Sequence, residues 1–211
     1  MSIIFFDKDG VIVDSEGAYL KRNKQFLNSL GIEVKESELL KLVGSNPKRD
    51  ANLYKKWIKG KYSWSGFQDL RNAFFQTLDP IDFLSLKMPH LEETLYALKS
   101  KGHHLSIVSS SSLTGIQNIV NMYHINLYFD YLISGDLFEE SKPNPAIYNY
   151  AKDKYGVEEK MYAVEDSTLG IIAAKKAGLI VIAKRDLRYG FDQTQADYLI
   201  NDLHEIVNIV I

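Results

Sequence analysis

Short apolar runs alternate with amphipathic segments in the part of the chain that follows Pro89, and this alternation limits the possible folds more than any other feature. The short runs, which we predict as strands, cover residues 105–108, 131–133, 162–164, 179–183 and 198–200. The segments with apolar residues at helical spacing cover residues 91–100, 113–122, 145–155 and 169–177. Strands and helices that alternate across short connections favour a parallel sheet with helices on both faces. We therefore predict an α/β fold with a Rossmann-like, doubly wound parallel sheet.

One further strand is predicted at the start of the chain. Residues 3–6 are branched or aromatic and carry no charge, as in a strand that is buried on both faces. Residues 16–86, in contrast, show helical spacing and no strong strand signal. We predict a core domain of residues 1–14 and 88–211, with an all-helical cap domain, residues 15–87, inserted after the first strand.

The composition removes several classes of function. The 211 residues carry a net charge of −2 with acids and bases intermixed, so no basic surface for nucleic acid is expected. The absence of cysteine excludes disulfides, thiolate catalysis and cysteine-ligated zinc. No apolar run approaches the roughly 20 residues of a membrane span, and the first residues lack the pattern of a signal peptide. We expect a cytoplasmic protein that binds neither nucleic acid nor membranes. No metal-ligand spacing is found among the histidines, which are His90, His103, His104, His124 and His204, and no role is predicted for His90.

Two carboxylates follow the first predicted strand directly. Asp7 and Asp9 are two residues apart, so in an extended chain their side chains point to the same side. Gly10 allows the backbone to turn away immediately afterwards. A solvated turn is the alternative when this stretch is taken alone. Adjacent carboxylates repel one another, and Mg²⁺, which prefers oxygen ligands, would relieve that repulsion.

Other polar residues follow other predicted strands. Ser109 follows residues 105–108, Lys142 lies on the loop after residues 131–133, and Glu165 with Asp166 follows residues 162–164. In parallel α/β sheets, ligands bind beyond the carboxyl ends of the strands. The sequence thus predicts one site at this edge, with carboxylates, a hydroxyl and an ammonium group.

Four segments resemble the motifs of the haloacid dehalogenase superfamily, in its phosphatase and phosphomutase branch. They read FDKDGVIVDS at residues 6–15 (motif I), SSSSL at 109–113 (motif II), KPNP at 142–145 (motif III) and EDSTLG at 165–170 (motif IV). Their order and spacing span most of the predicted core. Lys8 occupies a slot that is more often apolar in that family, and Ala146 one that is often acidic.

Asp7 is the predicted nucleophile, because a carboxylate with a pKa of about 4 is ionised at neutral pH and needs no base. Mg²⁺ and Lys142 would cancel the charge between this carboxylate and an anionic phosphoryl group. Asp9 is placed to protonate the leaving oxygen and then to accept a proton from the hydrolytic water. The resemblance implies that the backbone carbonyl of Asp9 also binds the metal.

Ser109 and Ser110 precede a predicted helix, where hydroxyls and free amides form a site for phosphate. The resemblance implies that the phosphoryl group binds there. Helix capping is the alternative for Ser109, although Ser111 or Ser112 would cap the helix equally well.

Motifs III and IV supply the other predicted groups. The resemblance implies that Lys142 neutralises nucleophile and phosphate, that Asp166 binds Mg²⁺, and that Glu165 binds it directly or through a water. A solvated loop lysine is the alternative for Lys142, and a helix cap by Asp166 or Ser167 is the alternative for motif IV.

In the predicted cap, Asn46 reads as an N-cap and Pro47 as the first helical residue. Lys48 and Arg49 then lie in the first turn, where the helix dipole disfavours cations. An anionic substrate would explain them, and a solvated pair is the alternative.

These residues predict an Mg²⁺-dependent phosphatase that acts on a small phosphorylated metabolite, such as a sugar or polyol phosphate, through an aspartyl phosphate on Asp7. A β-phosphoglucomutase-like phosphomutase is the alternative enzyme, but Tyr19 stands where those mutases carry a histidine. A non-catalytic phosphate-binding protein is the alternative from another class. Haloalkanoate dehalogenases lack the aspartate that Asp9 supplies here.

Overall fold

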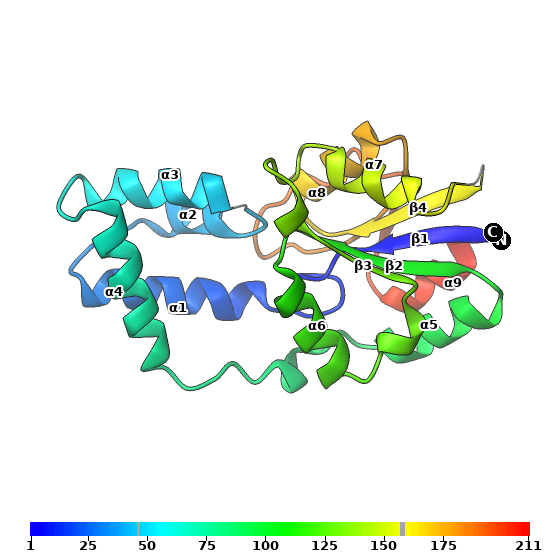
Figure 1. Ribbon diagram of the computed structural model, residues 1–211, viewed down its shortest axis with the longest axis horizontal. Coiled ribbons are helices and arrows are strands. Elements are labelled where there is room, and N and C mark those ends of the chain that lie inside the picture. Colours follow the sequence, from blue (N-terminus) through cyan, green and yellow to red (C-terminus); the bar gives the residue numbers. More distant parts are fainter. Residues whose placement is uncertain (46, 157–158) are drawn as a thin grey trace. The chain divides into compact units, whose positions relative to one another are not determined.

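A computed structural model describes residues 1–45, 47–156 and 159–211, which form two compact units (Figure 1). The first unit combines Met1–Asp14 with Phe83–Ile211, and the second is Ser15–Asp82.

The first unit is built on a parallel sheet, as the alternation predicted. Its strands are β1 (Ser2–Phe6), β2 (His104–Ser109), β3 (Tyr131–Ser134), β4 (Lys160–Glu165), β5 (Ile180–Lys184) and β6 (Tyr198–Ile200). Their order in the sheet is β3-β2-β1-β4-β5-β6, and all neighbours are parallel. The fold is therefore a doubly wound α/β fold.

Helices cover both faces of this sheet. They are α5 (Leu91–Ser100), α6 (Leu113–Met122), α7 (Ala146–Asp153), α8 (Thr168–Lys176) and α9 (Ile206–Ile209). Helices α5, α6 and α9 lie on one face, and α7 and α8 on the other (Figure 1). Because side chains alternate along a strand, Ile4 and Phe6 enter the first core, while Ile3 and Phe5 enter the second. All of β1 is buried for this reason.

The strand register brings the ends of three strands to the same level. Phe6 is paired with Ile107 of β2 and with Val164 of β4. The sheet order reverses beside β1, since β2 and β4 lie on its two sides. Ligands of doubly wound sheets bind at such a point.

The described residues of the second unit form helices and no strand. The helices are α1 (Glu16–Ser29), α2 (Glu36–Leu39), α3 (Pro47–Ile58) and α4 (Trp64–Gln76), with a short 3₁₀ turn at Leu40–Leu42. Their core is rich in aromatic residues, including Phe26, Tyr54 and Phe67, whose rings lie in contact.

The second compact unit ends at Asp82, whereas the predicted cap extends to residue 87. Phe83 and Leu86 pack against the core of the first unit. The backbone N–H of Asp14 donates to the carbonyl of Leu86 (2.8 Å). This hydrogen bond joins the end of Met1–Asp14 to the start of Phe83–Ile211, the two parts of the first unit. Residues 83–87 therefore group with the sheet.

Within the described ranges, no helix has the length and apolar character needed to cross a membrane.

Candidate active site

Asp7 follows the central strand β1, and the sheet fixes its position. Its backbone N–H donates to the carbonyl of Val164 (2.9 Å), and the residue is 8% exposed. Gly10 makes the following turn with φ of 77°. A Cβ on Gly10 would lie 2.0 Å from Oδ2 of Asp166, so glycine is required both for the backbone and for this close approach.

The Lys142 ammonium group connects three of the strand ends. Its Nζ donates to Oδ1 of Asp7 (2.7 Å), to Oε1 of Glu165 (2.6 Å) and to the carbonyl of Val108 (3.0 Å). Lys142 is 5% exposed. Burial acts to lower the pKa of Lys142, but Asp7 and Glu165 outweigh it and raise that pKa well above its usual value. The lysine is therefore charged and rigidly held, which argues against a solvated loop residue.

Glu165, the last residue of β4, is completely buried. Its Oε1 accepts a hydrogen bond from the Tyr148 hydroxyl (2.5 Å) in addition to that from Lys142. Its Oε2 is buried and has no hydrogen-bond partner among the described residues. A Cβ on Gly170 would lie 1.9 Å from this oxygen, so the glycine of motif IV makes room for the carboxylate.

Asp7, Glu165 and Asp166 each offer a carboxylate oxygen, and these oxygens lie within 4.8 Å of one another. Burial, together with the charges of Glu165 and Asp9, raises the pKa of Asp7 from 3.8 to about 7 despite the opposing charge of Lys142. The positive charge of the buried Lys142 ammonium group therefore does not neutralise the negative charge of these carboxylates. Buried carboxylate oxygens with excess negative charge, one of them without a hydrogen-bond partner, fit a divalent cation such as Mg²⁺.

The Asp9 side chain is not one of this group of three carboxylates and contacts other side chains. Its Oδ1 lies 3.0 Å from Nζ of the buried Lys8, and its Oδ2 accepts a hydrogen bond from Oγ of Ser111 (2.7 Å). Both carboxylate oxygens thus have a positioned donor. This arrangement suits a proton-transfer group better than a side-chain metal ligand.

The serine run places its members in different roles. Ser109 is 1% exposed, and its Oγ accepts a hydrogen bond from the N–H of Ser111 (3.2 Å). Ser110 is partly buried, and its Oγ accepts one from Ser141 (2.9 Å). The N-cap of α6 is Ser112, whose Oγ accepts from Gly115 N–H (3.2 Å). Helix capping therefore does not account for Ser109.

The N-cap of α8 is likewise Ser167, whose Oγ accepts a hydrogen bond from the N–H of Gly170 (3.1 Å). Asp166 instead lies with the other carboxylates. Ser167 therefore caps α8, and helix capping does not account for Asp166.

Of the predicted site residues, the structure joins Asp7, Lys142, Glu165 and Asp166 in one cluster. Lys48 and Arg49 are exposed residues in the first turn of α3, in the other compact unit, and their role stays a prediction. The N-cap prediction for Asn46 lies outside the described residues.

Sequence reasoning missed two supporting residues, Ser111 and Tyr148. The sequence predicts only a helix-cap role for Ser111, yet its hydroxyl donates a hydrogen bond to Asp9. Tyr148 lies on α7 at helical spacing and reads as a core aromatic, and nothing in the local sequence indicates that its hydroxyl meets Glu165.

The fold and the site together define an α/β protein with an acidic, lysine-bridged centre at the carboxyl edge of a doubly wound sheet. A family model described as haloacid dehalogenase-like hydrolase matches residues 4–184. The chain belongs to this family.

Several relatives of this chain bear the names of phosphatases. The chain is 30% identical over 180 residues to a phosphoglycolate phosphatase of Aquifex aeolicus, a match that covers 84% of this chain and 82% of that protein. It is 26% identical over 177 residues to hexitol phosphatase B of Escherichia coli (strain K12), covering 82% of this chain and 78% of that one. The crystal structure of β-phosphoglucomutase from Clostridium difficile superposes with a TM-score of 0.77 at 19% identity, over 97% of this chain and 92% of that one. The last likeness shows the fold alone.

Proposed function

We propose that this chain is an Mg²⁺-dependent phosphatase that hydrolyses a small phosphorylated metabolite, of the sugar or polyol phosphate class. The observation that carries the proposal is the 2.7 Å contact between the Lys142 ammonium and Oδ1 of Asp7, at the end of the central strand. A carboxylate beside a fixed cation is suited to approach an anionic phosphoryl group. The names of the relatives support the same reaction class.

Asp7 acts as the nucleophile in this proposal. One of its carboxylate oxygens attacks phosphorus, and the bond from phosphorus to the ester oxygen breaks, which leaves an aspartyl phosphate on the enzyme. Lys142 keeps the carboxylate in place and offsets the charge that the two anions bring together. Glu165 accepts a second hydrogen bond from Lys142, and the Tyr148 hydroxyl donates to the same Glu165 oxygen.

Asp9 transfers the protons. As a carboxylic acid it protonates the departing ester oxygen, and as a carboxylate it accepts a proton from the water that attacks the phosphoenzyme. That attack releases inorganic phosphate and restores Asp7. Lys8 and Ser111 hold the two Asp9 oxygens, so the side chain keeps one orientation through both steps.

Asp7, Asp166 and the backbone carbonyl of Asp9 are the proposed Mg²⁺ ligands, with Glu165 next to them. Mg²⁺ would neutralise phosphoryl oxygens and restore the ionised form of Asp7. Ser109 and Ser110 are the proposed phosphoryl-binding residues, because Ser109 ends β2 and Ser110 follows it at the same edge.

Lys48 and Arg49 stay the predicted contacts for the part of an anionic substrate that lies beyond its phosphoryl group. If they have this role, the double variant K48A/R49A should raise KM for phosphate esters in which the rest of the molecule is also anionic. KM should be unchanged for phosphate esters in which the rest of the molecule is neutral. Equal effects on both kinds of ester would contradict the role.

Phosphate release from a panel of phosphorylated sugars, polyols and glycolate tests the proposal. Wild-type protein and the Asp7→Asn variant are compared with Mg²⁺ and with excess chelator. Metal-dependent release that the variant lacks is the expected result. Substantial release by Asp7→Asn would contradict the covalent mechanism, and no release by wild type from any ester would contradict the phosphatase.

A phosphomutase shares this fold and is the alternative enzyme. Such an enzyme would convert one sugar phosphate into an isomer without net phosphate release. Analysis of the sugar products in the same reactions separates the two activities.

A further inference from the structure

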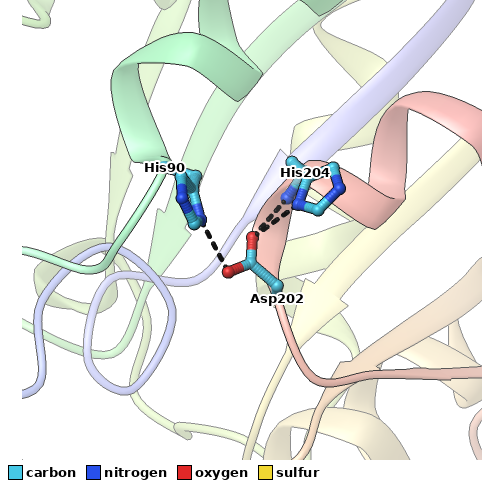
Figure 2. A group of neighbouring side chains, drawn as sticks. All are labelled: His90, Asp202 and His204. Carbon is cyan, nitrogen blue, oxygen red and sulfur yellow. Dashed lines mark hydrogen bonds and ion pairs between the residues drawn. The ribbon is translucent and has the colours of Figure 1, made fainter.

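A second group of metal-ligating side chains lies on the surface of the sheet-containing unit, and it shares no residue with the carboxylate centre. It consists of His90, Asp202 and His204 (Figure 2). Nδ1 of His90 lies 2.7 Å from Oδ2 of Asp202, and Nδ1 of His204 lies 3.0 Å from Oδ1. One ligand atom from each residue lies within 4.8 Å of the other two. The two imidazoles thus face one carboxylate from separate parts of the chain.

The backbone fixes His90 at the start of α5. Its carbonyl accepts hydrogen bonds from both the N–H (3.0 Å) and the Oγ1 (2.7 Å) of Thr94. Leu91, the next residue, is 1% exposed and belongs to the core. The imidazole therefore extends from an anchored turn toward the segment after β6 (Figure 2).

Asp202 is the N-cap of the short turn Leu203–Glu205 and forms a capping box with Glu205. Oδ1 of Asp202 accepts a hydrogen bond from the N–H of His204 (3.0 Å), while Oε1 of Glu205 accepts one from the N–H of Asp202 (2.8 Å). Leu203 and Ile206 are buried at 1% and 0% and fix this turn against the core. The ligand positions are thus held by backbone contacts that do not depend on the imidazoles.

The chemistry of this set differs from that of the active site. Imidazole nitrogens suit Zn²⁺, Cu²⁺ and Ni²⁺, whereas Mg²⁺ prefers an all-oxygen set. Two histidines and one carboxylate are also a protein ligand set known for catalytic zinc, in which water fills the remaining position. The side chains of His90 and His204 are 49% and 62% exposed, so water has access here.

We propose that His90, Asp202 and His204 bind a divalent transition-metal ion such as Zn²⁺ on the surface of this unit. Each imidazole would bind through the Nδ1 atom that now faces Asp202, and the carboxylate would bind between them. The ion would connect the start of α5 to the C-terminal segment that follows β6. This site is independent of the phosphatase reaction.

Zinc titration in the presence of a chromophoric chelator tests the proposal. The full chain is first stripped of metal and then kept in excess Mg²⁺, so that the carboxylate centre is occupied. His90→Asn and His204→Asn each remove one imidazole. Asn is chosen because His90 has a φ of 54°, which Asn tolerates better than most residues.

His124→Asn is a matched control. His124 is also an exposed histidine with a positive φ, of 56°, and it lies outside the group. Wild type and His124→Asn should bind one Zn²⁺ with equal affinity and show the same rise in the thermal midpoint. His90→Asn and His204→Asn should bind Zn²⁺ at least about tenfold more weakly.

Equal zinc affinity in all four proteins would overturn the proposal, since the ion would then bind elsewhere. The same holds if Zn²⁺ binding is lost in excess Mg²⁺ or in Asp7→Asn, because the ion would then be at the carboxylate centre. These readouts do not use phosphate release, so failure of the zinc site and failure of the phosphatase are separate results.

Discussion

Asp7→Asn is expected to stabilise the metal-free protein above neutral pH, although it removes the proposed nucleophile. Burial is the main cause that raises the pKa of Asp7 from 3.8 to about 7, with Glu165 and Asp9 adding to it and Lys142 opposing it. One pKa unit corresponds to about 1.4 kcal/mol, so ionised Asp7 costs the metal-free fold about 4 kcal/mol. Asparagine has a similar shape and an oxygen that accepts from Lys142, but it carries no charge.

The pH dependence follows from the direction of this shift. The contribution of the protonated Asp7 is fully present below the unfolded pKa of 3.8 and is lost as the pH rises through about 7. The free energy of unfolding of wild type, relative to that of Asp7→Asn, should therefore fall by about 4 kcal/mol between about pH 4 and pH 8. Saturating Mg²⁺ should reverse much of this difference, because the cation favours the ionised carboxylate.

The assay must report on the unit that contains Asp7. Both tryptophans, Trp57 and Trp64, lie in the other unit, so tryptophan fluorescence would follow the wrong part of the chain. Hydrogen exchange of the β1 and β4 amides, measured with chelator at both pH values, gives the required free energies. A variant that is destabilised by the same amount at both pH values would refute the reasoning, since that result indicates lost packing and not relieved charge.

Further substitutions test the groups that support the site. Gly170→Ala places a Cβ 1.9 Å from Oε2 of Glu165 and should lower the free energy of unfolding by about 1–3 kcal/mol, together with the rate of phosphate release. Gly115→Ala is the matched control, because Gly115 also lies three residues after a serine N-cap. Its added Cβ would lie 3.2 Å from that serine. Equal losses in both variants would contradict a specific effect on the Glu165 carboxylate. Ser111→Ala removes the hydrogen bond to Asp9, worth about 1.5–3 kcal/mol for a charged partner, so kcat should fall about ten- to hundredfold with little change in KM. An unchanged kcat in steady-state assays would show that Ser111 does not position Asp9.

Local patterns were sufficient to predict most elements of the sheet-containing unit. The predicted helices at residues 91–100 and 113–122 agree with α5 and α6. Their apolar periodicity reflects the face that each helix buries. The short helix α9 was not predicted, because the four residues Ile206–Ile209 are too few to show a period.

The rule that ligands bind at strand ends was sufficient to predict that Asp7, Lys142 and Glu165 share a site. It could not predict the supporting contacts, such as the Tyr148 hydroxyl on Glu165. That contact depends on how helix α7 rotates against the sheet, and periodicity alone describes such a residue as core.

The group of His90, Asp202 and His204 shows the same limit more clearly. No local spacing connects His90 with Asp202, because 112 residues separate them along the chain. They meet because α5 and the segment after β6 pack against one core. The histidines show no metal-ligand spacing in the sequence, but sequence spacing carries no information about this contact.

By itself, the sequence determined the α/β class, most of the strands and helices in their order along the chain, and the chemical groups that follow each strand, because these depend on neighbouring residues. The tertiary structure alone decided that the buried carboxylates of Asp7 and Glu165 share one ammonium group, that burial raises the pKa of Asp7 to about 7, and that two histidines meet one aspartate. Charge interaction and desolvation depend on distance and burial, and both are set only when distant parts of the chain pack together.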